Sequence, residues 1–120
     1  MIKKNYSKLW LVFVNIIAKK GFKFIDLIDI DKNISSNFIG AWANILIKAD
    51  SIYDALQIVP IGLNELGFEI VNIDKIENIL SKVENNEIKK DVIKEGDWLL
   101  KSDFVFKISD KIFPYEDLKK

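Results

Sequence analysis

The chain has 120 residues, with 18 lysines, 18 acidic residues and a formal net charge of zero. This length fits one domain spanning residues 1–120 with one core, and it leaves no room for separate cofactor and substrate domains. A content of 49% hydrophobic and 30% charged residues is typical of a globular chain and excludes the polar, highly charged composition of disorder.

Four residue types are missing from the chain: histidine, cysteine, arginine and threonine. Without histidine and cysteine there is no side chain with an ordinary pKa near neutrality, no Ser-His or Cys-His nucleophile, no disulfide and no thiolate metal site. Without arginine the bidentate groups that grip phosphates are missing, and a net charge of zero gives no overall attraction to nucleic acid. We therefore expect a non-enzymatic protein that binds no cofactor, no metal and no nucleic acid.

The first predicted element is a strand over residues 9–17. Both alternating sets of side chains are apolar, which is typical of a central strand with two covered faces. Lysines precede this run and resemble the start of an export signal, but Asn15 interrupts it and Lys19-Lys20 follow it at once. Ten residues are also too few for a membrane-spanning helix. We expect a cytoplasmic protein without a membrane partner.

Two more strands are predicted before the middle of the chain. Residues 22–30 indicate a second strand after a turn at Gly21, and residues 31–37 have the composition of a loop. Residues 38–48 then predict a long apolar strand.

A helix is predicted over residues 51–66, because its apolar residues fall on one helical stripe. Asp50 or Ser51 can cap its start and Gly67 can end it, while Pro60 is expected to kink it. Residues 68–73 predict the next strand, so that strand, helix and strand form a right-handed β-α-β crossover.

The remaining chain predicts two helices and a strand. Apolar spacing indicates a short helix over residues 76–83 and a longer one over 87–101, which Gly96 weakens. Residues 104–108 alternate as a final strand, and residues 112–115 predict an edge segment or packed tail. The fold class is therefore α/β in its α+β form: a single mixed sheet of about five strands, with helices packed on it and one β-α-β unit.

Motifs for ion and phosphate chemistry are incomplete. Asp29 and Asp31 match the start of a calcium-binding loop, but Ile34 and Gly40 stand where the loop needs glycine and glutamate. Together with Asp26 these carboxylates could hold magnesium, although a solvated turn is the simpler interpretation.

Two glycines also have the spacing of a phosphate-binding loop. Phe68 and Glu69 follow Gly67, however, where that loop requires lysine and serine or threonine. Carboxylate pairs four residues apart, such as Asp50 with Asp54, could serve a two-carboxylate hydrolase, but such pairs are common on protein surfaces.

Charge is segregated along the chain. Residues 1–25 hold six lysines and no acid, whereas residues 26–88 hold eleven acids and four lysines. Such an acidic stretch can steer a basic partner, although charge runs are also typical of ordinary solvated faces. Trp10 and Trp42 lie in apolar runs, whereas Trp98, with Tyr53 and Tyr115, suits an exposed interface anchor. The candidate partner-binding residues are Asp26, Asp29, Asp31, Asp50, Tyr53, Asp54, Glu65, Glu69, Asp74, Glu77 and Trp98.

Two stretches carry a resemblance to a known class of proteins. Residues 38–76 (FIGAWANILIKADSIYDALQIVPIGLNELGFEIVNIDKI) and 97–116 (DWLLKSDFVFKISDKIFPYE) resemble small immunity proteins of bacterial contact-dependent growth inhibition and related polymorphic toxin systems. The likeness is one of size, composition and style. It implies a cytosolic protein that binds one cognate toxin domain, often a nuclease, and blocks its active site.

Two alternatives stay open beside the immunity protein. One is a regulatory domain that binds a small molecule in a cleft of the sheet, and the other is a structural subunit of an oligomer. Without its partner we expect the chain to be a monomer or a weak dimer.

Overall fold

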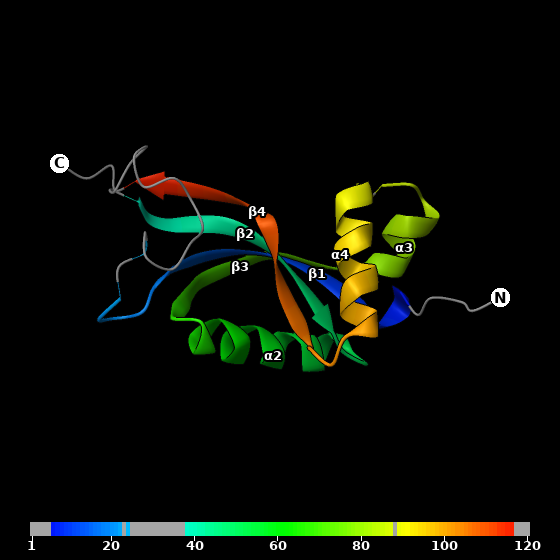
Figure 1. Cartoon of the computed structure of the whole chain (residues 1–120), viewed down its shortest axis with the longest axis horizontal. Coiled ribbons are helices and arrows are strands. Elements are labelled where there is room, and N and C mark those ends of the chain that lie inside the picture. The colour runs from blue at the N-terminus through cyan, green and yellow to red at the C-terminus, as the bar shows by residue number, and fades with distance from the viewer. Residues whose placement is uncertain (1–5, 23, 25–37, 88, 117–120) are drawn as a thin grey trace.

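The structure, a computed structural model, describes residues 6–22, 24, 38–87 and 89–116 (Figure 1). In chain order its elements are the 3-10 helix η1 (Tyr6–Lys8), β1 (Leu9–Ala18), β2 (Phe38–Lys48), α2 (Ile52–Glu65), β3 (Phe68–Asn78), α3 (Ile79–Glu84), α4 (Lys90–Lys101) and β4 (Phe106–Glu116).

The strands form one sheet, which in the described part of the chain has four strands in the order β3-β1-β2-β4. β1 lies in its centre, where Val14 pairs with Ala43 of β2 on one side and Ile73 of β3 on the other. Because β2 and β3 are both antiparallel to β1, they run parallel to each other, and α2 connects them. The predicted α+β class, central first strand and β-α-β unit are confirmed.

The expectation of a mixed sheet needs one refinement. Each hydrogen-bonded pair among the described strands is antiparallel, because β1 inserts between the two parallel strands of the crossover. Most of the strand predicted over residues 22–30 lies outside the described residues.

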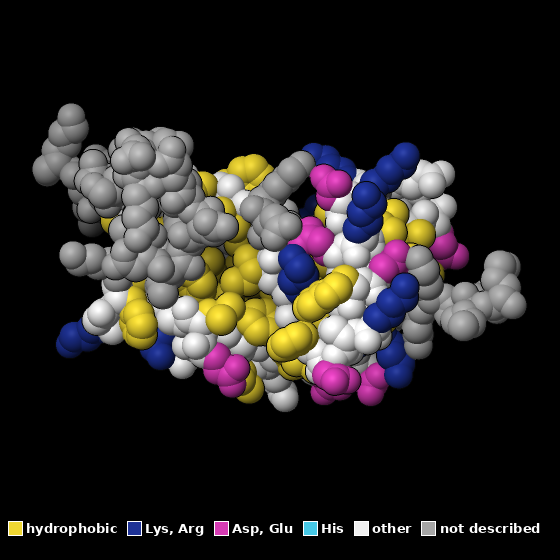
Figure 2. Space-filling view, in the orientation of Figure 1, with side chains coloured by type: hydrophobic (Ala, Val, Ile, Leu, Met, Phe, Trp, Pro, Cys, Tyr) yellow, Lys and Arg dark blue, Asp and Glu magenta, His cyan; other side chains and the backbone are white. Residues whose placement is uncertain are grey.

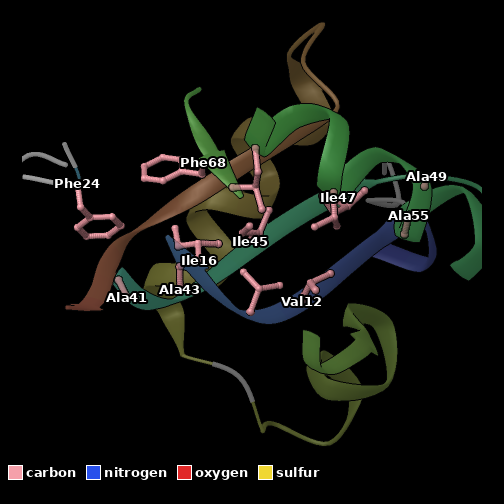
Figure 3. Close-up of a cluster of buried hydrophobic side chains, with 13 residues drawn as sticks. Val12, Ile16, Phe24, Ala41, Ala43, Ile45, Ile47, Ala49, Ala55 and Phe68 are labelled. Atoms are coloured by element: carbon pink, nitrogen blue, oxygen red, sulfur yellow. The ribbon is translucent and has the colours of Figure 1, made fainter. Parts of the chain in front are cut away.

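The main core lies between the sheet and α2. Alternate residues of the two central strands, such as Val12 and Ile45, are fully buried and face Ala55, Val59 and Leu63 of the helix. Figure 3 shows these side chains gathered on one side of the strands. Only half of the predicted helical stripe is used in this packing, because Ile52, Leu56 and Leu66 are exposed. The packing buries apolar area, which chiefly stabilises the fold.

A second, smaller core covers the other face of the sheet at one end. Leu9 and Leu46 point away from α2 and pack with Ile79 of α3 and Leu99 of α4, all of them buried. In Figure 1 α3 and α4 stand together near the N-terminal end of the sheet. A Cβ on the buried Gly96 would lie 3.0 Å from Leu9 Cδ1, which is the end of a side chain that can shift.

The ends of α2 agree with the prediction. Ser51 is its N-cap, with its hydroxyl accepting a hydrogen bond from the backbone N–H of Asp54 at 3.2 Å. Gly67 follows the helix with a φ of +94°, a conformation that glycine adopts without strain. Pro60 lies inside α2, which continues beyond it to Glu65.

Five predicted boundaries are wrong: the end of β3, the starts of α3 and α4, and both ends of β4. β3 continues to Asn78, so Ile76 belongs to a strand, and α3 begins at Ile79, where Asn78 Oδ1 accepts from the N–H of Leu80 at 3.0 Å. The spacing of three between Ile70, Ile73 and Ile76 resembles a helix, but register shifts in the β1–β3 pairing turn all three toward the main core. α4 begins at residue 90. The last strand runs over residues 106–116 at the edge of the sheet, and it includes the expected edge segment 112–115.

Candidate functional site

Four large apolar side chains are exposed together where α2, α4 and the start of β4 meet. Ile61 is 62% exposed, Trp98 47%, Phe104 63% and Val105 46%. We call these four residues the apolar corner. Figure 2 shows hydrophobic side chains on the surface over this part of the molecule.

Contacts and chain connectivity place the members of the corner near one another. The rings of Trp98 and Phe104 stack with their centroids 5.7 Å apart and their planes at 18°. Val105 follows Phe104, and the ring of Phe106 lies against the backbone of Gly62, next to Ile61 in α2. Exposed apolar residues of α2, of α4 and of the segment before β4 therefore lie near one another.

Lys48 at the end of β2 fixes the position of this corner. Its backbone N–H donates to the carbonyl of Val105 at 2.8 Å. Its ammonium group donates to the carbonyls of Leu99 and Ser102 at 3.1 and 2.7 Å, so the lysine caps the C-terminal end of α4. This one lysine thus joins the sheet to α4, which carries Trp98, and to the following segment, which carries Phe104.

A cleft of about 540 Å³ opens beside the corner, between the end of β2 and the outer side of α2. The carboxylates of Asp50 and Asp54 line it, and Lys8 Nζ forms an ion pair with Asp50 Oδ1 at 3.2 Å. Its complete lining is Lys8, Lys48, Ala49, Asp50, Asp54, Gln57, Ile58 and Ile61.

The structure brings three of the predicted partner-binding residues together. Asp50 and Asp54 lie in the cleft, and Trp98 lies in the adjoining corner. Tyr53 is 76% exposed at the start of α2, next to Asp54. Glu65 is exposed at the other end of the same 14-residue helix, about 16 Å from Asp54 along the axis.

The predicted acids on β3 do not belong to this site. Glu69, Asp74 and Glu77 lie on the edge strand at the opposite side of the sheet from β4. The acidic middle of the sequence is therefore split between separate surfaces. Asp26, Asp29 and Asp31 lie outside the described residues.

Glu77 is held in a local charge cluster. Its carboxylate forms ion pairs with Lys82 at 3.0 Å and Lys75 at 3.3 Å. Burial acts to raise the pKa of Glu77, but hydrogen bonds and charge interactions with these two lysines outweigh it and hold the pKa below its ordinary value. This carboxylate is engaged within its own chain.

Three residues of the corner are missing from the sequence prediction: Ile61, Phe104 and Val105. Ile61 falls off the buried stripe of α2, and an isoleucine at such a position is a usable signal of an exposed apolar site. Phe104 and Val105 are assigned in the sequence to a strand, whereas β4 begins only at Phe106.

Tyr115 is not an exposed anchor. It is half-buried, and its hydroxyl donates to Asn15 Oδ1 at 2.5 Å across the sheet. Trp10 and Trp42 have structural roles, since Trp10 Nε1 donates to the carbonyl of Ala49 at 3.1 Å and Trp42 stacks on Phe13 at 5.2 Å.

Neither a metal centre nor a membrane-spanning helix is seen in the part of the chain that the structure describes. Among those residues no three acidic side chains lie close enough to hold a metal ion. None of the helices described is both long and apolar enough to cross a bilayer. The corner and the cleft combine exposed apolar side chains with carboxylates.

Comparisons with protein-family models, curated proteins and solved structures find no significant match to this chain.

Proposed function

We propose that this protein is a non-enzymatic binding module, an immunity protein that neutralises a cognate toxin domain in the cytoplasm by direct contact. The observation that carries the proposal is the apolar corner, where two stacked aromatic rings and two aliphatic side chains face solvent. Contiguous exposed apolar surface rimmed by polar groups is typical of protein interfaces, and tryptophan is enriched among the residues that dominate binding.

The charges beside the corner support a basic partner. Asp50 and Asp54 lie next to it in the cleft, and acidic groups at the edge of an interface steer a positively charged partner and speed its association. A nuclease toxin presents a basic surface to its phosphate-rich substrate. An acidic binding surface is therefore complementary to the region that an inhibitor must cover.

The test is co-expression with the product of the neighbouring gene. We expect the two proteins to co-purify as a stable complex and the immunity protein to protect cells from the toxin. A variant with Trp98→Ala and Phe104→Ala should lose protection, while Phe113→Ala, which removes an exposed aromatic ring at residue 113 on β4, should keep it. A neighbour that neither binds nor harms unprotected cells would remove the basis for the proposal.

A regulatory domain that binds a small molecule is the second candidate, and the cleft is the observation that favours it. Its volume of about 540 Å³ lies within the range of small-molecule sites, and polar groups converge on it. A ligand there would raise the melting temperature of the purified protein. Sedimentation of the same sample tests our proposal that the chain is a monomer or weak dimer before it meets its partner.

A further inference from the structure

The outer side of α2 carries a seam that its core packing uses only at one residue, Ile58. Asp54, Ile58, Ile61 and Glu65 are spaced by four, three and four residues, so they lie along one side of the helix. Two isoleucines therefore lie between two carboxylates. In Figure 2 acidic side chains appear along the lower edge, where α2 runs, with hydrophobic surface beside them.

The seam is open to solvent over most of its length. Asp54, Ile61 and Glu65 are exposed, and only Ile58 packs partly against the main core. Ile58 and Ile61 also line the cleft, and Phe106 packs against Gly62 just beside the seam. The seam thus shares Ile61 with the apolar corner and resembles one half of a helix–helix interface.

The seam's charges select the kind of helix that fits it. Asp50 already pairs with Lys8, which shows that the cleft accepts an ammonium group. Within the described residues no lysine pairs with Asp54 or Glu65. Each end of the seam therefore offers a carboxylate that no lysine of the described residues occupies.

A second copy of this chain does not suit the seam. An α2–α2 contact in either direction would place Asp54 and Glu65 against acidic residues of the other copy, and like charges at such positions repel. Anionic lipid headgroups would be repelled in the same way. A basic, amphipathic helix of a different protein meets both the apolar and the charged part of the seam.

We infer that the α2 seam docks an amphipathic helix of the protein partner that carries a lysine or arginine at each end of a short apolar stretch. The inference rests on the proposed function only in requiring a protein partner. The two cations of the partner helix lie about 16 Å apart, matching Asp54 and Glu65 along α2.

The experiment uses the full chain and two labelled helical peptides of about 18 residues. Both have the same leucine stripe, and one has lysine where the other has glutamate at the two ends of the stripe. By fluorescence anisotropy we expect the lysine peptide to bind at least about tenfold more tightly than the glutamate peptide. Equal affinity for the two peptides, or binding of neither, would overturn the inference.

Charge-reversal variants test the position of the site. The double variant Asp54→Lys with Glu65→Lys should reverse the preference and favour the glutamate peptide. The control, Glu69→Lys with Asp74→Lys, makes the same charge change on β3 and should keep the original preference. If the control reverses the preference as fully as the seam variant, net charge and not the seam selects the peptide, and the inference fails.

The cognate toxin separates this inference from the proposed function. If the seam variants bind the toxin as tightly as the native chain, the proposed immunity function stands, but the inference that the seam docks the partner helix fails. If the lysine peptide is preferred as expected but the neighbouring gene product does not bind, the immunity function fails, and the inference about the seam stands. Circular dichroism of each variant verifies that the fold is retained.

Discussion

The ring of Phe106 lies against the backbone of Gly62, so that a Cβ added to this glycine would lie 2.7 Å from Phe106 Cε1. Gly62 is buried in α2, and Phe106 begins β4. This approach packs the start of β4 onto α2, and Phe104 and Val105 come just before this contact in the chain. The apolar corner therefore depends on a glycine at this helical position.

Gly62→Ala should destabilise the fold by about 1–2 kcal/mol, because overpacking against a rigid ring outweighs the better helix propensity of alanine. Gly96→Ala is the matched control inside α4. There the new Cβ would meet only the end of the Leu9 side chain at 3.0 Å, and the change should stay within about 1 kcal/mol of zero. Urea unfolding measures both. A fully stable Gly62→Ala variant would contradict the close contact.

Lys107→Met should lower the free energy of unfolding by about 1–3 kcal/mol, as expected for a hydrogen bond between charged groups with little exposure. Lys107 Nζ lies 2.7 Å from Glu95 Oε2 and joins β4 to α4, with the two side chains only 25% and 13% exposed. Lys8→Met breaks the exposed pair with Asp50 and should cost less than about 1 kcal/mol. Equal losses in the two variants, measured by urea unfolding, would show that burial does not strengthen the inner pair.

Acid should weaken the contribution of Glu77 to stability. Its pKa in the folded chain lies below the ordinary value of 4.5, so the carboxylate stabilises the fold above pH 4.5 and loses this effect as the pH falls through the folded value. The stability difference between the native chain and Glu77→Gln should therefore be constant near neutrality and shrink below pH 4.5. Urea unfolding of both proteins from pH 7 down to about pH 3 measures it. A difference that does not change with pH would refute the role of the two lysines.

The order of elements follows closely from the sequence, and the reason is local. Period-two apolar runs mark the central strands, and a period near 3.6 with Ser51 and Gly67 at its ends marks α2. The end of β3 was mispredicted because bulges let Ile70, Ile73 and Ile76 share a face in a strand. A bulge depends on the pairing of two distant segments, which a local pattern does not contain.

The candidate site follows only in part from the sequence, because it depends on long-range contacts. Trp98 beside charged neighbours was a correct prediction of an exposed aromatic residue. Its stacking with Phe104 depends on Lys48, which caps α4 from a strand about 50 residues earlier. The acidic stretch divides because α2 and β3 carry its members to different surfaces, and no linear charge count shows that separation.

Trp98→Ala and Phe104→Ala should each weaken binding of the cognate toxin domain by more than about tenfold, as truncation of a central aromatic anchor does. Because the two rings stack on each other, the double variant should lose less than the sum of the two single losses in free energy. Both side chains are about half exposed or more, so folding should change little.

Phe113→Ala provides the control for these anchors. Phe113 is 54% exposed but pairs with Trp42, about 20 Å along β2 from Lys48 and the corner. Titration calorimetry with the purified toxin domain should give an unchanged affinity for this variant. If instead Phe113→Ala weakens binding and Trp98→Ala leaves it within about twofold, the interface lies at the other end of the sheet, and the corner has no part in recognition.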